Sequence, residues 1–94
     1  MVKHIVTWQF KDGTENEVKA FLKGLDGLMG VVEVLRSVET HYNQNAKEGI
    51  TGALICTFDS MADLASYASD PRHLAVAAMC KPIRTSRIAV DFEI

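Results

Sequence analysis

The sequence is poor in several features that mark common classes of protein. Its two cysteines, Cys56 and Cys80, belong to no C-x-x-C pair and to no Cys/His ligand spacing, so two reduced thiols of a cytoplasmic protein are expected. Lysine and arginine form no cluster and the net charge is −2, which argues against a nucleic-acid partner, because phosphate neutralisation needs concentrated positive charge. Gly-rich phosphate loops and nucleophile elbows are also missing.

Long apolar runs are missing as well. Residues 1–8 carry neither the apolar stretch nor the small-residue cleavage site of a secretory signal, and no segment is long enough for a membrane span. What is present is a globular composition, because 48% of the residues are hydrophobic, which is enough to form a core. We expect residues 1–94 to form one domain with no membrane contact.

Four stretches alternate between two faces with the period of a β-strand. These predicted strands cover residues 2–10, 33–43, 50–58 and 87–94. In the first strand, the more apolar face carries Val2, His4, Val6, Trp8 and Phe10. In the last strand, it carries Ile88, Val90, Phe92 and Ile94. We expect the more apolar face of every strand to lie under the helices.

A first helix is expected between the first two strands. Thr14 to Glu17 fits a capping box, in which the two side chains each satisfy a free N–H group at the helix start. An apolar stripe at helical spacing follows, and Gly27 and Gly30 are suited to its end because glycine accepts a left-handed cap conformation.

A second helix, interrupted in the middle, is expected before the last strand. Ser60 is its predicted N-cap. Pro71 cannot continue the helix, because its ring clashes with the preceding turn and it lacks an N–H group. Pro71 does suit the first position of a new segment capped by Asp70, which we expect to run to about Cys80.

This order of elements predicts an α+β, ferredoxin-like βαββαβ fold, with a four-stranded antiparallel sheet and both helices on one face. The opposite face is expected to be a mixture of small and apolar residues. It comprises Ile5, Thr7, Ala53, Ile55, Thr57 and Ala89. Such a face often marks an interaction surface, and a second identical sheet is the simplest cover. We therefore predict a homodimer packed sheet to sheet.

Short segments along essentially the whole chain resemble the stress-responsive A/B barrel (Dabb) family. They are Lys3-His4-Ile5-Val6, Thr57-Phe58-Asp59-Ser60, Tyr67 with Pro71 and His73, and Val90-Asp91-Phe92-Glu93-Ile94. The resemblance implies that two chains join through their sheets into a dimeric α/β barrel. Most members of the family have no established activity, but one branch comprises cofactor-independent polyketide cyclases of the olivetolic acid cyclase type, which use a histidine as general base and a tyrosine as substrate anchor.

The candidate site residues follow from this resemblance. His73 matches the general base and Tyr67 matches the anchor, so these two are the candidate catalytic residues. His4 matches a further pocket histidine, and Trp8 on the same strand face is a second candidate ligand contact. The chain departs from the cyclases at Asp70, where those enzymes have a second histidine.

Each candidate residue also has a structural interpretation. His73, in the first turn of a helix, can be a neutral base or a side chain that hydrogen-bonds to the backbone at the helix break. Tyr67 can stabilise an enolate oxygen or fill the core. His4 can be a satisfied core histidine, and Trp8 can serve packing alone. No metal site is expected, since His41 falls on the opposite sheet face to His4.

The sequence leaves two functions open. One is a small dimeric protein that holds a small molecule between sheet and helices without any chemistry. The other is a cofactor-independent cyclase or aldol-type enzyme, in which His73 removes a proton next to a carbonyl group while Tyr67 holds the carbonyl oxygen. Neither needs a cofactor, and a monooxygenase of the same barrel type has no motif to support it. The two functions differ in whether His73 and Tyr67 converge on an open pocket.

Overall fold

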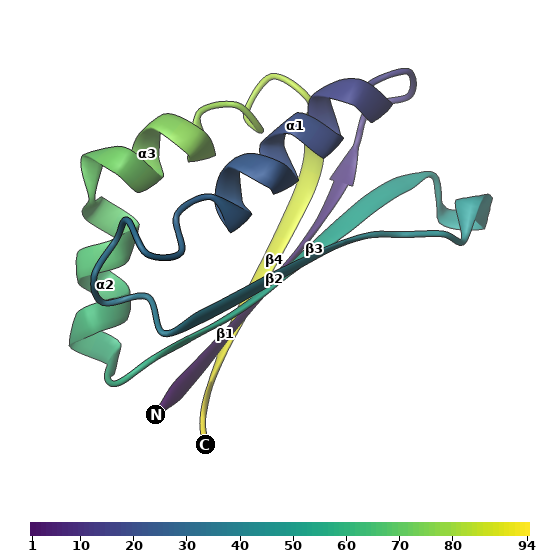
Figure 1. Cartoon of the computed structure of the whole chain (residues 1–94). Helices are drawn as coiled ribbons and strands as arrows, with labels where there is room; N and C mark the ends of the chain where they lie inside the picture. The colour runs from purple at the N-terminus through teal and green to yellow at the C-terminus, as the bar shows by residue number, and fades with distance from the viewer.

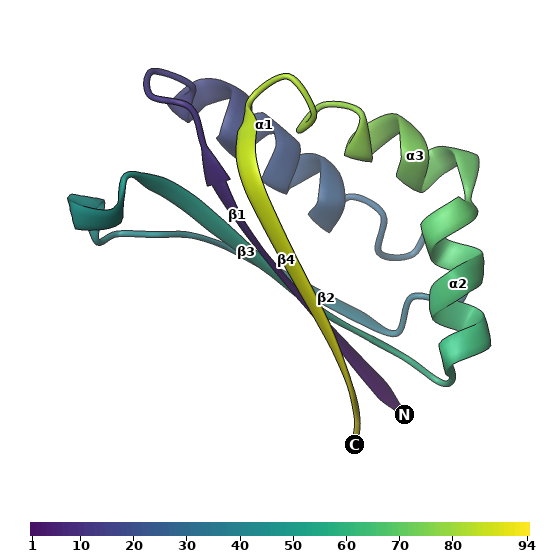
Figure 2. The same ribbon diagram turned by 180° about the vertical axis from the view of Figure 1, so that it is seen from behind.

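The chain forms one antiparallel sheet with its helices on a single side (Figure 1, Figure 2). The computed structural model describes the backbone of residues 1–94 and every side chain except that of Ala46. The elements, in order, are β1 Val2–Phe10, α1 Glu15–Asp26, β2 Ser37–Tyr42, the 3-10 turn η1 Ala46–Glu48, β3 Ile50–Phe58, α2 Met61–Ser69, α3 Pro71–Ala77 and β4 Arg84–Glu93. The ferredoxin-like βαββαβ prediction is confirmed.

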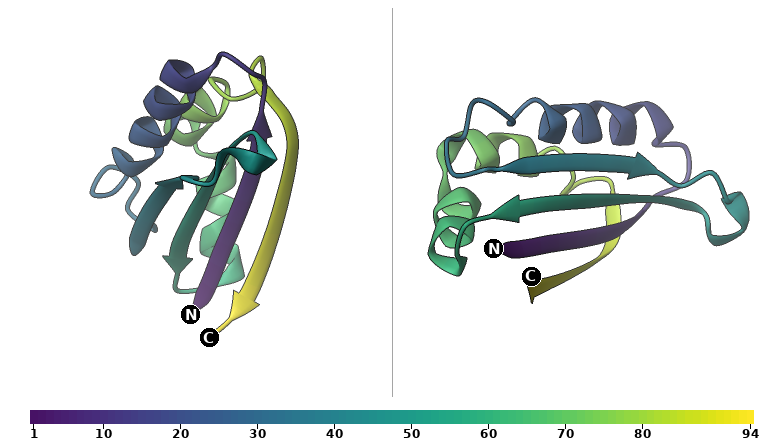
Figure 3. Two further views of the ribbon diagram at one scale, coloured as in Figure 1. Left: turned by 90° about the vertical axis from the view of Figure 1, so that its right-hand side faces the viewer. Right: turned by 60° about the horizontal axis from the view of Figure 1, so that its bottom comes forward.

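The strands lie in the order β2-β3-β1-β4, so β2 and β4 are the edges (Figure 3). All three pairings are antiparallel. Val2 at the start of β1 faces Glu93 at the end of β4, which brings the two chain ends together, and the amide of Ile94 donates to the carbonyl oxygen of Met1 at 2.9 Å.

The hydrophobic core fills the space between the helices and the central strands. α1 buries Val18, Phe21, Leu22 and Leu25 along one stripe. β1 and β3 bury alternate residues against this stripe, as period two requires. The ring of Phe21 meets the ring of Trp8 edge to face, with centroids 5.1 Å apart, so the centre of the core is aromatic.

The predicted second strand begins too early. Residues 33 and 34 lie in a turn, residues 35 and 36 belong to no regular element, and β2 begins only at Ser37. The reason is the exit from α1, where Gly30 takes a left-handed conformation with φ of +82° and the following amides bond locally: Val32 donates to Leu28 and Leu35 donates to Val32. Local hydrogen bonds thus use the amides of Val32 and Leu35, and the first amide that bonds across to β3 is that of Arg36, which donates to the carbonyl oxygen of Thr57 at 2.9 Å.

The predicted faces of the last strand are reversed, and the strand begins at Arg84 rather than at residue 87. Its register sets Ala89 opposite Val6 and Val90 opposite Ile5. Ala89 therefore lies on the helix side, where we had not expected it. The residues on the bare side are Ile88, Val90 and Phe92. The rule that the apolar face lies under the helices fails at β4, an edge strand whose helix side carries Arg87, Ala89 and Asp91 and whose apolar face lies on the bare side.

The N-caps predicted from the sequence are confirmed for α2 and α3 but not for α1. Ser60 Oγ accepts a hydrogen bond from the amide of Asp63, and the Asp70 side chain caps α3. Thr14, by contrast, makes no side-chain cap: its hydroxyl donates to the carbonyl oxygen of Lys11 at 2.6 Å, so the predicted capping box is wrong. α3 also stops at Ala77, before the predicted end.

Candidate functional site

The break between α2 and α3 brings the two candidate catalytic residues into contact. Asp70, at the break, has an extended backbone with ψ of 130°, which redirects the chain after one helix and before the next. Tyr67 near the end of α2 and His73 in the first turn of α3 then face each other, with ring centroids 4.3 Å apart. Tyr67 is only 1% exposed, because Phe58 of β3 covers its other side.

A cavity of about 290 Å³ lies beside this pair, between the helices and the helix side of β1 and β4. Tyr67 and His73 line it from the helices, and His4, Ala89 and Asp91 line it from the sheet. A smaller cavity of about 80 Å³ is lined by Trp8 and shares His4, His73 and Arg87 with the first. The four predicted site residues, His4, Trp8, Tyr67 and His73, therefore line two cavities that share His4 and His73.

The proton of the His73 ring can be placed from its contact with the backbone. Nδ1 lies 3.2 Å from the carbonyl oxygen of Ala68. Since a carbonyl oxygen only accepts hydrogen bonds, Nδ1 carries the proton, and Nε2 keeps a free lone pair in the neutral ring. Burial lowers the pKa of His73, and the charges of His4 and Arg87 act in the same direction. The ring is therefore a neutral hydrogen-bond acceptor near pH 7, which is the form that a general base needs.

His4 is held by a partner that sequence reasoning missed. Its Nδ1 lies 2.5 Å from Oδ1 of Asp91, directly across the β1–β4 pairing. The carboxylate accepts from Nδ1–H and fixes the ring, so that Nε2 is again the free acceptor in the neutral form. The β1–β4 register of the structure sets Asp91 directly opposite His4 on the helix side. The reversed face assignment hid this contact.

Two buried donors in this region lack a partner. Among the residues that the structure describes, the hydroxyl of Tyr67 and Nε1 of Trp8 are buried without a hydrogen bond. A buried polar group left unsatisfied costs on the order of 1–3 kcal/mol. Burial also raises the pKa of Tyr67, so the phenol keeps its proton and remains a donor. Both groups can donate to an acceptor atom of a bound molecule.

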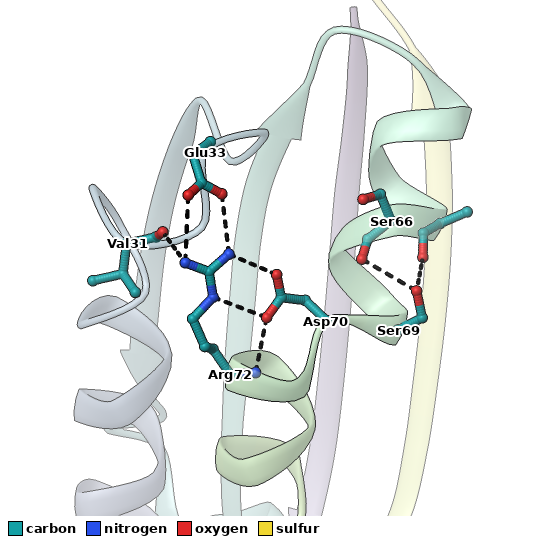
Figure 4. Close-up of polar contacts among 7 residues, drawn as sticks. Val31, Glu33, Ser66, Ser69, Asp70 and Arg72 are labelled. Atoms are coloured by element: carbon teal, nitrogen blue, oxygen red, sulfur yellow. Dashed lines mark hydrogen bonds and ion pairs between the residues drawn. The ribbon is translucent and has the colours of Figure 1, made fainter.

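Arg72 serves a structural role at the break. Its guanidinium bridges Asp70 and Glu33 at 2.8 and 3.0 Å and donates to the carbonyl oxygen of Val31 at 2.7 Å (Figure 4). These contacts tie the loop after α1 to the junction of α2 and α3, and the hydrogen bonds from Arg72 lower the pKa of Asp70 to about 2. Asp70, at the position that holds a histidine in the cyclases that this chain resembles, therefore takes part in the ion pairs of Arg72 beside the site. It lines neither cavity.

A third hollow, of about 560 Å³, lies on the bare side of the sheet and does not include Tyr67 or His73. His41 lines it together with Thr7 and Ala53, so His41 is on the face opposite to His4, as its strand position indicates. In the described part of the chain, no group of three or more His, Cys, Asp and Glu side chains could hold a metal ion. None of the described helices has the length and apolarity to cross a membrane.

Comparison with known proteins agrees with the fold and the segments noted above. The profile of the stress responsive A/B barrel domain matches residues 2–94. Two stress-response A/B barrel domain-containing proteins of Arabidopsis thaliana are 26% and 25% identical over 98% of this chain, covering 85% and 88% of the relatives. A dimeric ferredoxin-like protein of unknown function from Bacteroides fragilis is 30% identical with a TM-score of 0.84, over 99% of this chain and 95% of that chain.

Enzymes share the fold as well. A hydroxynitrile lyase from Passiflora edulis has a TM-score of 0.83 over 99% of this chain and 92% of its own, at 19% identity, which shows a common fold alone. The family profile covers nearly the whole chain, and the two relatives from Arabidopsis thaliana align over 98% of it. The chain belongs to the stress-responsive A/B barrel domain family.

Proposed function

We propose that this protein is a homodimer that binds a small carbonyl compound in the cavity beside the helix break. The observation that carries the proposal is the buried, unpaired hydroxyl of Tyr67 in contact with the neutral ring of His73 at a cavity of about 290 Å³. A carbonyl oxygen is the simplest acceptor for such a donor. The volume falls close to the lower end of the range for small-molecule sites.

The homodimer rests on the bare face of the sheet. Ile88, Val90 and Phe92 on this face are 65%, 41% and 52% exposed, which is a large apolar area for an edge strand to leave in water. A second sheet laid on this face would cover these side chains in both copies. The relative from Bacteroides fragilis is itself dimeric.

A titration with a simple ketone tests the binding proposal. Heptan-2-one should shift the amide resonances of Ala65, Ala68 and His73 at the cavity. Tyr67→Phe should weaken binding about two- to tenfold, because one net hydrogen bond of about 0.5–1.5 kcal/mol is lost. His41→Asn is the matched control on the other face of the sheet and should bind as the wild type does. Equal affinity of Tyr67→Phe and wild type would contradict the role of the hydroxyl.

A second candidate function, proton transfer, is favoured by the geometry of His73. Nδ1 is engaged by Ala68, which leaves Nε2 as the only basic atom of the ring. Nε2 takes the proton next to the carbonyl, the C–H electron pair forms the enolate double bond, and the oxygen accepts the hydrogen bond of Tyr67. The enolate carbon then attacks a second carbonyl carbon of the same molecule, and the imidazolium returns its proton to the new alkoxide. Atoms and electrons balance without a cofactor.

Hydrogen exchange at carbon tests this chemistry separately from binding. The wild-type protein should accelerate the replacement of the α-protons of heptan-2-one by deuterium, followed by NMR in D₂O. Replacing His73 by Asn should remove about a hundredfold or more of that rate, the usual range for a general base. His41→Asn should keep the wild-type rate. A His73→Asn protein that is folded and exchanges as fast as the wild type would exclude His73 as the base.

A further inference from the structure

Basic side chains gather at one end of the candidate site. Lys81, Arg84 and Arg87 line a surface hollow of about 500 Å³ at the start of β4. The same three side chains also line the small inner cavity, together with His4 and His73. Arg87 belongs in addition to the larger cavity of Tyr67. The hollow, called the opening below, and the inner cavity therefore lie on two sides of the same three cations.

These three cations have no acidic partner in the part of the chain that the structure describes. The other arginines do: Arg36 pairs with Asp59, and Arg72 pairs with Glu33 and Asp70. Asp91 is the carboxylate that lines the larger cavity, and it is bonded to His4. Positive charges gathered without compensation at a partly enclosed opening attract an anion more strongly than the same charges spread over a surface.

Two further observations place this positive field at the inner cavity. Cys80 lines that cavity. Burial raises the pKa of its thiol, whereas the charges of Arg84, Arg87 and Lys81 lower that pKa. The three positive charges therefore act on the same buried side chain. Trp8, in the same lining, is the residue whose Nε1–H is buried without a partner. A buried indole N–H normally has an acceptor. The lining of the inner cavity therefore contains the three cations and a residue with an unused donor.

We propose that the ligand of this protein carries an oxyanion, a carboxylate or a phosphate monoester, which Lys81, Arg84 and Arg87 bind at the opening. The carbonyl end then lies toward Tyr67, so the ligand class is an acidic carbonyl compound such as an oxo acid. The placement of the carbonyl rests on the proposed function, whereas the anion site rests on the basic opening alone. The rest of the inner lining is apolar, with Phe21 and Leu25 among its members, and suits the carbon chain that joins the two ends.

The test compares each methyl-ketone acid of a homologous series, from 4-oxopentanoate upward, with its own methyl ester. Binding is followed by NMR above the titration range of histidine, so that lysine and arginine are the positively charged side chains. The acid that fits best should bind at least about tenfold tighter than its ester, and added salt should reduce this preference. Inorganic phosphate is the competitor: displacement of the acid assigns the site to phosphate as well, and lack of displacement assigns it to carboxylate.

Substitutions then locate the site. Lys81→Gln combined with Arg84→Gln should reduce the preference for the acid over the ester, because only Arg87 of the three cations remains. Lys23→Gln, an exposed cation in the last turn of α1, is the matched control and should keep the preference. Equal binding of acid and ester by the wild type, or a preference that the double substitution leaves unchanged, would overturn the anion site.

The outcomes also separate this proposal from the preceding one. If acid and ester shift the resonances of Ala68 and His73 equally, the carbonyl site stands and the anion site fails. If the acid shifts Ala77 and Cys80 while neither compound reaches Ala68, the anion site stands and the carbonyl site fails.

Discussion

At the scale of single residues, the candidate site depends on a few contacts that fix protonation. The carbonyl oxygen of Ala68 sets the tautomer of His73, and Asp91 does the same for His4. Tyr67 and His73 could be found from the sequence, because the Asp70-Pro71 pair marks a helix break with an aromatic residue before it and a histidine after it. Asp91 could not be found in the same way, because its face depends on how β4 is covered.

The lowered pKa of His73 predicts a pH dependence of stability. The unfolded chain takes up a proton near the ordinary histidine pKa of about 6.5, while the folded protein, whose pKa is lower, does not. The unfolded state therefore binds more protons below that pH, and the contribution of His73 to stability, present above it, is lost as the pH falls toward the folded pKa.

Urea unfolding between about pH 7.5 and about pH 5.5 measures this effect. The wild type should lose stability across this range, and His73→Asn should show a smaller loss. An equal loss in His73→Asn and wild type would show that His73 titrates alike in the folded and unfolded chains.

At the scale of elements, α1 and α3 approach each other at a glycine. A Cβ atom on Gly24 would lie 3.1 Å from Cγ1 of Val76, tighter than an ordinary contact. The lack of a side chain thus lets α3 pack against α1 and sets the position of the helix that carries His73. From the sequence, the glycines of this region, Gly27 and Gly30, were interpreted only as signals for the end of the helix. The close approach of α1 to α3 at Gly24 could not be predicted, because it depends on two segments that are far apart in the sequence.

Gly24→Ala tests this packing. In a helix interior the substitution gains about 1 kcal/mol of stability from helix propensity. In the wild-type background, the contact with Val76 should cancel this gain, whereas in a Val76→Ala background the gain should appear in full. Urea unfolding of the four proteins in this double-mutant cycle measures the difference. The same gain in both backgrounds would show that the helices adjust freely at this point.

At the scale of the whole molecule, the bare sheet face is the surface through which we propose that two copies pair. The register of β4 adds Ile88, Val90 and Phe92 to Ile5 and Thr7 on this face. The dimer was predicted from the sequence on a less apolar group of residues, with Ala89 as the contribution of the last strand. The register of the structure replaces Ala89 by three larger apolar side chains, so the apolar face is larger than predicted. The fold class was predictable because strand periods and helix caps are local signals. The faces of β4 were not, because they depend on a surface outside the chain.

Val90→Asp tests the dimer. A carboxylate on this face would be buried without a partner in both copies, at a cost of several kcal/mol. Sedimentation velocity at micromolar concentration should show a dimer for the wild type and a monomer for Val90→Asp. Leu74→Asp removes an equally exposed apolar side chain from α3, on the helix side, and should remain dimeric. A dimer that persists in Val90→Asp would place the interface elsewhere.

The central claim is that the cavity at the helix break is where a carbonyl compound binds, and a crystal structure with heptan-2-one tests it most directly. The account predicts the ketone in the cavity between Tyr67 and His4, with its oxygen within hydrogen-bonding distance of the Tyr67 hydroxyl. A ketone bound only in the hollow on the bare sheet face, beside His41, would contradict the account.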